Sequence, residues 1–177
     1  MDQLDNVSQV LERKMDIRIV YLPPTTVISS HHIGEGPEEV AGTKIYSLIR
    51  DINLPVIKPD FRVFGFNNPS PSHEQSVYGY EFWVTVPETI EVEESYEKKY
   101  FPGDLYAAHC IKFGDFHEWE AFSNQLSTSE EYEIDYRSPD GMGGCLEEEL
   151  NVYNNILESV QKTEQLDLLI PIKQRIQ

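Results

Sequence analysis

The sequence is short of cysteine, since Cys110 and Cys145 are the only two among its 177 residues. They do not form the paired spacing of a zinc site or a dithiol redox motif. The histidines supply no such spacing either, because His31 and His32 are adjacent on a strand pattern and His117 lacks the second histidine of a zinc-protease helix. We therefore predict reduced thiols, as in a cytoplasmic protein, and neither a metal nor another cofactor.

Basic residues are also scarce, with 14 lysines and arginines against 31 aspartates and glutamates, for a net charge of −17. A protein that neutralises phosphate groups needs an excess of Lys and Arg, so we expect no direct nucleic-acid binding. The same imbalance argues against an anionic membrane surface as partner. Most of the acidic side chains are expected to be solvated, but the acidity is compatible with a cationic ligand.

No apolar run reaches the roughly 20 residues that span a bilayer, and the first residues lack the hydrophobic core of a signal peptide. Both absences favour a cytoplasmic location. Hydrophobic residues still make up 40% of the chain, enough for one domain with a real core. Leu4, Val7 and Leu11 recur at helical spacing, so we expect an amphipathic helix over residues 1–14 and a single domain over residues 15–177.

Short strand patterns alternate with two helices along this domain. The first part predicts strands within residues 16–33, a helix over 36–53, and strands at 61–68 and 78–88. The second part predicts a strand within 101–114, a helix over 115–129 capped by Asp115, strands at 132–138 and 145–151, and a closing strand at 166–173. Residues 89–100 are either a connector or an edge strand, and residues 152–163 include a helical turn.

The order strand, helix, strand, strand therefore occurs twice, over about residues 16–88 and again over about residues 100–151. We interpret this pattern as a duplication. The predicted fold class is α+β, a duplicated βαββ module whose two halves, each with its own antiparallel sheet, are related by a pseudo-twofold axis and flank a central ligand cleft. Clefts of this kind are common sites for small ligands.

Several segments also occur in an order that is typical of one family. They are DIRIVYLPP, FRVFGFNNPSP, YGYEFWVTVPE, LYAAHCIKFGDFHEWEAF, CLEEELN and LDLLIPIK. Over about residues 15–174 the chain resembles the GyrI-like domain, the effector-binding domain of AraC-type and MerR-type multidrug regulators, and it is similar to the stand-alone form. The resemblance implies a cleft that binds hydrophobic, often cationic, drug-like molecules among aromatic rings and buried carboxylates. A subset of the family looks like hydrolases that open cyclopropane rings.

The resemblance also suggests which residues bind the ligand. The family often has a Glu, one further residue and a Tyr in the strand near the C-terminus, with the Glu pointing into the cleft. Here Glu147 takes the position of that carboxylate, and Glu149 stands where the Tyr is often found. Phe116 replaces the Tyr of a frequent Gly-Pro-Tyr triplet, so the ring remains and the hydroxyl is lost. Glu81 and Trp83 match the family's strand pattern as they are.

The residues around Glu81 leave two explanations open for a carboxylate inside a strand of β-forming residues. Glu81 and Trp83 share one face of the strand, and Tyr80 lies on the other. Glu81 either meets solvent or a basic partner, or it faces the cleft, where desolvation raises its pKa and a cationic ligand restores its charge. In the second case Trp83 adds cation–π attraction of about 0.5 to 2 kcal/mol.

The other candidates also have two explanations each. Glu147 and Glu149 fit either the cleft or an acidic edge strand that discourages aggregation. His109 precedes the second helix and is a candidate for a polar contact with the ligand. Four rings either belong to the core or contact the ligand: Phe66, Tyr80, Tyr106 and Phe116.

We therefore expect a protein that binds a small hydrophobic or cationic amphipathic molecule and acts in sensing or sequestration. Tyr80, Trp83 and Phe116 would stack the ligand, and Glu147 and Glu81 would supply charge. One alternative is a hydrolase of strained electrophiles such as cyclopropane-containing natural products, with one of these glutamates as general acid or base. Another is a regulator that contacts a protein partner through the N-terminal helix, which could also join two copies of the chain.

Overall fold

The computed structural model describes residues 15–72, 77–137, 141–158 and 162–176, so the helix predicted at residues 1–14 lies outside the described residues. None of the helices in these ranges is long and apolar enough to cross a membrane. The elements are, in chain order, β1 (Arg18–Leu22), β2 (Thr25–Ile33), α2 (Pro37–Asp51), α3 (Leu54–Ile57), β3 (Val63–Asn67), β4 (Gly79–Val86), β5 (Glu97–Phe101), β6 (Asp104–Lys112), α4 (Glu118–Ser127), β7 (Tyr132–Ile134), β8 (Leu146–Glu149), α5 (Val152–Glu158) and β9 (Gln165–Gln174).

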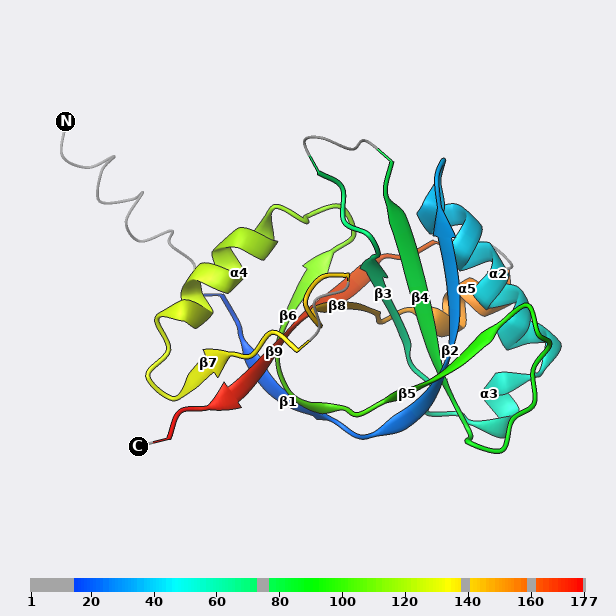
Figure 1. Ribbon diagram of the computed structural model, residues 1–177, viewed down its shortest axis with the longest axis horizontal. Coiled ribbons are helices and arrows are strands. Elements are labelled where there is room, and N and C mark those ends of the chain that lie inside the picture. Colours follow the sequence, from blue (N-terminus) through cyan, green and yellow to red (C-terminus); the bar gives the residue numbers. More distant parts are fainter. Residues whose placement is uncertain (1–14, 73–76, 138–140, 159–161, 177) are drawn as a thin grey trace.

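The strands form one curled antiparallel sheet with helices packed against it (Figure 1). The strand order is β1-β6-β9-β8-β3-β4-β2-β5, and β7 pairs with β9. Helix α2 lies over the half that contains β2 and β4, and α4 lies at the other half (Figure 1). This architecture confirms the predicted α+β class.

A duplication is present, as β2-α2-β3-β4 and β6-α4-β8-β9, but the prediction that the second copy ends near residue 151 is wrong. In each module the last strand lies in the middle, because β4 pairs with β2 and β3 while β9 pairs with β6 and β8. The closing strand therefore belongs to the second module, and β7 lies outside the repeat. The two halves join where β3, at the edge of the first module, pairs with β8, at the edge of the second. Gly65 of β3 lies opposite Glu147 of β8, so the halves share a single sheet.

The outermost strands are exchanged between the halves. β1 precedes the first module and pairs with β6 of the second, and β5 precedes the second module and pairs with β2 of the first. Pro23 and Pro24 lie between β1 and β2, where their missing N–H groups interrupt no ladder. Residues 89–100 thus contain both predicted options, a connector and then the start of edge strand β5.

The sheet buries side chains on both faces. Ile45 of α2 packs with Val84 of β4 in one helix-covered core, and Phe122 of α4 packs with Leu168 of β9 in the other. A third core lies on the face that the curl encloses and includes Phe64 together with residues from both halves. As a result, strands such as β4 and β8 are buried on both sides.

The two longest of the described helices, α2 and α4, begin differently. Helix α2 begins as predicted, with Pro37 in its first turn and Glu38 and Glu39 near the positive end of its dipole. Helix α4 begins at Glu118, with His117 at the N-cap position, so the prediction that Asp115 caps it is wrong. The carbonyl of Asp115 instead accepts the N–H of Glu118 in a preceding turn.

Candidate ligand-binding site

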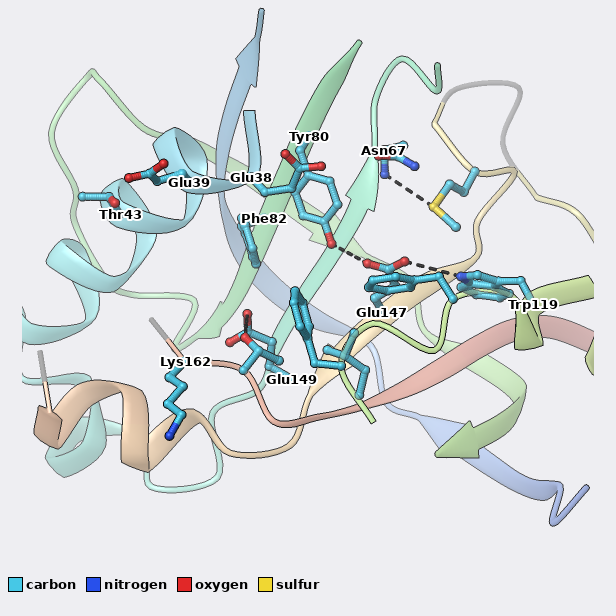
Figure 2. Close-up of a pocket in the computed structure, with 15 residues that line it drawn as sticks. Glu38, Glu39, Thr43, Asn67, Tyr80, Phe82, Trp119, Glu147, Glu149 and Lys162 are labelled. Carbon is cyan, nitrogen blue, oxygen red and sulfur yellow. Dashed lines mark hydrogen bonds between the residues drawn. The ribbon is translucent and has the colours of Figure 1, made fainter. Parts of the chain in front are cut away.

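A cavity of about 890 Å³ lies at the joint between the halves, on the helix-covered face of the sheet. Its floor comes from β3, β4 and β8, and its sides come from the N-terminal turns of α2 and α4 and from the chain that enters β9 (Figure 2). The volume falls within the range of about 300 to 1,000 Å³ that is usual for sites of small organic ligands.

Strand β8 supplies two carboxylates to the floor of this cavity. Alternate strand residues point to opposite faces, so Glu147 and Glu149 line the cavity while Glu148 points away and pairs with Arg62 through two hydrogen bonds. All three carboxylates are buried. Because β8 lies between β3 and β9, the explanation of this segment as an acidic edge strand is wrong.

Glu147 is held by aromatic donors from both halves. The hydroxyl of Tyr80 on β4 donates to Oε2 at 2.6 Å, and Nε1 of Trp119 on α4 donates to Oε1 at 3.4 Å (Figure 2). Burial raises the pKa of Glu147 against the lowering effect of these hydrogen bonds, and the charges of Glu38 and Glu149 raise it further. Neither of the two side chains that donate hydrogen bonds to Glu147 is basic.

Glu149 has a similar arrangement further along the strand. The hydroxyl of Tyr46 on α2 donates to Oε2, and the hydroxyl of Thr163 donates to Oε1 at 3.1 Å. Burial, together with the charge of Glu149, raises the pKa of Tyr46, so the phenol keeps its proton and remains a donor. Two phenols, from Tyr46 and Tyr80, thus approach β8 from other elements. Glu149 itself stands where the family often has a Tyr, so this strand carries no phenol at that position.

Apolar side chains form most of the cavity wall, among them Phe82 on the floor and Trp119 at the side. The rings of Phe113 and Phe116 meet edge to face with their centroids 5.6 Å apart. Because these two side chains are 58% and 37% exposed, they lie at the mouth rather than in the interior. Phe116, a predicted ligand contact, therefore lies at the mouth of this cavity.

The charges at the edge of the cavity are mostly negative. Glu38 and Glu39 come from the first turn of α2, and Tyr78 donates a 2.7 Å hydrogen bond to Glu38. The amine of Lys162 pairs with Glu164 at 3.8 Å and points away from Glu149 in Figure 2. Within the described ranges, no group of three or more His, Cys, Asp and Glu side chains is placed to hold a metal ion.

Glu81 does not face this cavity. It follows Tyr80 on β4 and therefore points to the enclosed face of the sheet, so the expectation that it shares a cleft with Glu147 is wrong. Burial alone would raise the pKa of Glu81, but hydrogen bonds from four donors outweigh this effect and hold the pKa below its ordinary value. The donors are Lys99, Ser29 and Trp83, each at 2.6 Å, and Asn68 at 2.8 Å.

Four more predicted site residues lie away from the cavity. Trp83, Phe66 and Tyr106 belong to the enclosed core, where the rings of Phe66 and Trp83 meet edge to face at 4.8 Å. His109 lies beneath α4, with its Nε2 2.6 Å from a carboxylate oxygen of Glu118. The predicted residues that the structure brings together are Tyr80, Phe116, Glu147 and Glu149.

Sequence reasoning missed several residues of the site. Phe82 shares a strand face with Tyr80, so the period-two pattern could have identified it. Trp119 lies in the apolar stripe of α4, and Tyr46 adjoins Ile45 on the buried side of α2. Residues in such stripes usually belong to the core, and nothing in the local pattern distinguishes a side chain at the edge of a cavity.

Structures of known proteins share this fold. The chain is similar to EcmrR in its complex with DNA, with a TM-score of 0.61 and 14% identity over 98% of this chain and 66% of EcmrR. It is similar to a hydrolase from Listeria innocua, with a TM-score of 0.59 and 11% identity over 96% of this chain and 98% of the hydrolase. It is also similar to SAV2435 bound to tetraphenylphosphonium, with a TM-score of 0.50 and 11% identity over 90% of this chain and 94% of SAV2435.

At these identities the likeness establishes the fold alone, and the chain spans just under two thirds of the EcmrR chain. No curated protein matches the sequence. Residues 18–172 match the model of the Cass2 family, whose description is integron-associated effector binding protein. This range contains the cavity and both of its buried carboxylates. The GyrI-like fold expected from the sequence is thereby confirmed, and the chain belongs to the Cass2 family of integron-associated effector binding proteins.

Proposed function

We propose that this protein binds a small hydrophobic cation in the cavity between its halves and acts in sensing or sequestering such molecules. The observation that carries the proposal is the carboxylate of Glu147, which is 8% exposed and held by the aromatic donors Tyr80 and Trp119. Its ionised form is penalised by burial, so an organic cation that enters the cavity supplies the missing counter-charge.

The walls of the cavity suit the rest of such a ligand. Phe82 and Trp119 present aromatic surface to the interior, and Phe116 presents it at the mouth. A cation over an aromatic ring gains about 0.5 to 2 kcal/mol, and buried apolar surface adds about 25 cal/mol per Å². An inorganic cation would use only the carboxylates, and a neutral hydrophobic molecule would use only the rings, whereas a lipophilic cation uses both.

The family and the proteins of similar fold support this class of ligand. The family is one of effector-binding proteins, and SAV2435, which has the same fold, was solved with the lipophilic cation tetraphenylphosphonium. EcmrR was solved with DNA. The present chain has a net charge of −17, so in a sensing role it would report its ligand to a partner protein rather than to DNA directly.

Titration with tetraphenylphosphonium, followed by tryptophan fluorescence, tests where the ligand binds. The chain has two tryptophans, and they serve as matched probes because Trp119 lines the cavity and Trp83 lies in the enclosed core. We expect the fluorescence change on binding to persist in Trp83→Phe and to disappear in Trp119→Phe. A change that followed Trp83 would place the ligand outside the cavity.

Calorimetric titration of a charge variant tests how the ligand binds. Glu147→Gln should weaken tetraphenylphosphonium binding at neutral pH about tenfold or more, equivalent to about 1.4 kcal/mol. Glu91→Gln removes a charge from an exposed residue away from the cavity and should leave the affinity unchanged. Equal affinities for the wild type and Glu147→Gln would rule out the charge role of Glu147.

A second candidate function is hydrolysis, which is favoured by the hydrogen-bonded pair of Tyr80 and Glu147 and by the similar fold of a Listeria innocua hydrolase. A carboxyl group whose pKa is raised in an apolar pocket can activate water for attack on a strained electrophile such as a cyclopropane. Product formation that is lost in Glu147→Gln while binding is retained would favour the hydrolase, and binding without product would favour the binding protein.

A further inference from the structure

We propose that the cavity is built for a ligand with two positive centres, one recognised by Glu147 and the other by Glu149. This inference rests on the proposed function, because it names the charge pattern of the ligand in the same cavity. Glu149 is thereby assigned a role of its own, that of the residue that determines specificity for dications.

The spacing of the two carboxylates follows from the strand. Glu147 and Glu149 are separated by one residue of β8 and face the same side, so their Cα atoms are about 7 Å apart. Both residues are more than nine-tenths buried, with exposed fractions of 8% and 6%, and both line the cavity. A strand placed here fixes this spacing more firmly than a loop could, because β8 is paired on both sides.

Each carboxylate also has its own phenol donor. Tyr80 donates to Glu147, and Tyr46 donates to Glu149 (Figure 2 shows the first of these bonds). Each phenol is buried and is directed to one carboxylate. The two carboxylates are therefore oriented separately, as two subsites.

A ligand with a single positive centre would pair with only one of the two floor carboxylates. Glu38 and Glu39 stand at the edge of the cavity in addition to the two buried carboxylates. The basic residue among the described lining is Lys162, whose side chain is 69% exposed and pairs with Glu164. A ligand with two cationic groups would place one against each floor carboxylate, and the rings of Phe82 and Trp119 favour a flat aromatic scaffold between those groups.

Two ligands of nearly the same shape test the inference. Methyl viologen is a rigid pair of aromatic rings with a positive nitrogen at each end, and para-phenyl-N-methylpyridinium has the same ring pair with one positive nitrogen. We would titrate each into the wild type, Glu149→Gln, Glu147→Gln and the exposed control Glu91→Gln by calorimetry at one ionic strength. Tetraphenylphosphonium, a monocation, would be titrated alongside, and circular dichroism would check that each variant folds.

We expect methyl viologen to bind the wild type about tenfold more tightly than its monocationic counterpart. Glu149→Gln should remove most of this advantage and change the monocation's affinity less than about threefold, whereas Glu147→Gln should weaken both ligands. Equal affinities of the two ligands for the wild type would overturn the inference, and this comparison does not depend on a variant that folds. If tetraphenylphosphonium binds in that case, the proposed function survives, and if no cation binds, both proposals fail.

Discussion

The phenol of Tyr80 reaches from one half of the duplicated sheet to the other, where it donates a 2.6 Å hydrogen bond to the carboxylate of Glu147. Strand β3 lies between their two strands, and it presents Gly65 opposite Glu147. A Cβ atom at Gly65 would lie 2.3 Å from the Tyr80 hydroxyl oxygen. Glycine at this position therefore leaves the space through which the two halves build one site.

Gly65→Ala should disrupt this contact. The added methyl group would displace the Tyr80 ring, so we expect the free energy of unfolding to fall by about 1 to 3 kcal/mol and tetraphenylphosphonium binding to weaken several-fold. Urea unfolding and calorimetry measure the two effects. In a Tyr80→Phe background, where the hydroxyl is absent, the same substitution should cost less, and an equal cost in both backgrounds would contradict the explanation.

Glu147 should make the protein less stable as the pH rises. Its pKa in the folded protein is raised above the ordinary value of 4.5 by burial, so between the two pKa values the folded state binds a proton that the unfolded state has released. The free energy of unfolding falls with pH wherever the folded state binds more protons. The stabilisation is therefore complete below the ordinary pKa and is lost as the pH passes through the raised one.

Thermal unfolding of Glu147→Gln and the wild type across this pH range measures the effect. As the pH rises, the melting temperature of the variant should increase relative to that of the wild type. The corresponding difference in the free energy of unfolding should change by about 1.4 kcal/mol for each unit by which the pKa of Glu147 is raised. A difference between the two proteins that does not change with pH would show that Glu147 titrates normally.

Substitutions of Glu147 and Glu148, which are neighbours on β8, should differ in their effects on stability and on ligand affinity. Glu148 points away from the cavity and pairs with Arg62, which is partly exposed. We expect Glu148→Gln to lower the free energy of unfolding by about 1 to 3 kcal/mol and to leave ligand affinity unchanged, because a buried charge-assisted pair is broken outside the site. Loss of affinity in Glu148→Gln with no change in Glu147→Gln would mean that the strand faces the other way.

Lys99→Met should destabilise the protein without affecting the cavity. The substitution leaves the 1% exposed carboxylate of Glu81 without its basic partner, and we expect a loss of about 2 to 3 kcal/mol, reduced from the value of a fully buried pair because Lys99 is partly exposed. Denaturant unfolding measures this loss, and adding Glu81→Gln should recover part of it. Weakened ligand binding in Lys99→Met would indicate that Glu81 does contribute to the site.

Local patterns predicted most of the strands, the helices α2 and α4, and the existence of a repeat, because each of these elements has its own periodicity. They did not predict α3, and they assigned the wrong last strand to the second copy of the repeat. They could not show how elements distant in the chain pair. The exchange of β1 and β5 between the halves, and the pairing of β3 with β8, depend on contacts far apart in sequence. The helix at α4 was predicted three residues too long at its start, because Asp115 resembles a capping residue but lies in a preceding turn.

The sequence predicted only part of the site, because a local pattern does not show which face of a strand borders a cavity. Period two placed Tyr80 and Glu81 on opposite faces of β4, but the pattern could not show which face borders the cavity, since the two side chains are 7% and 1% exposed. Both faces of a central strand in a curled sheet are buried, so hydrophobicity no longer distinguishes them. The family resemblance pointed to Glu147, which lines the cavity, whereas Tyr46 is indistinguishable from a core residue of α2.

Proton release on ligand binding tests the central claim most directly, because the claim is that a cation binds the ionised carboxylate of Glu147. Calorimetric titration with tetraphenylphosphonium at mildly acid pH, in buffers of different ionisation enthalpy, measures the protons exchanged. We predict that the wild type releases protons on binding and that Glu147→Gln releases far fewer and binds more weakly. Binding of equal affinity with equal proton release in the two proteins would contradict the account.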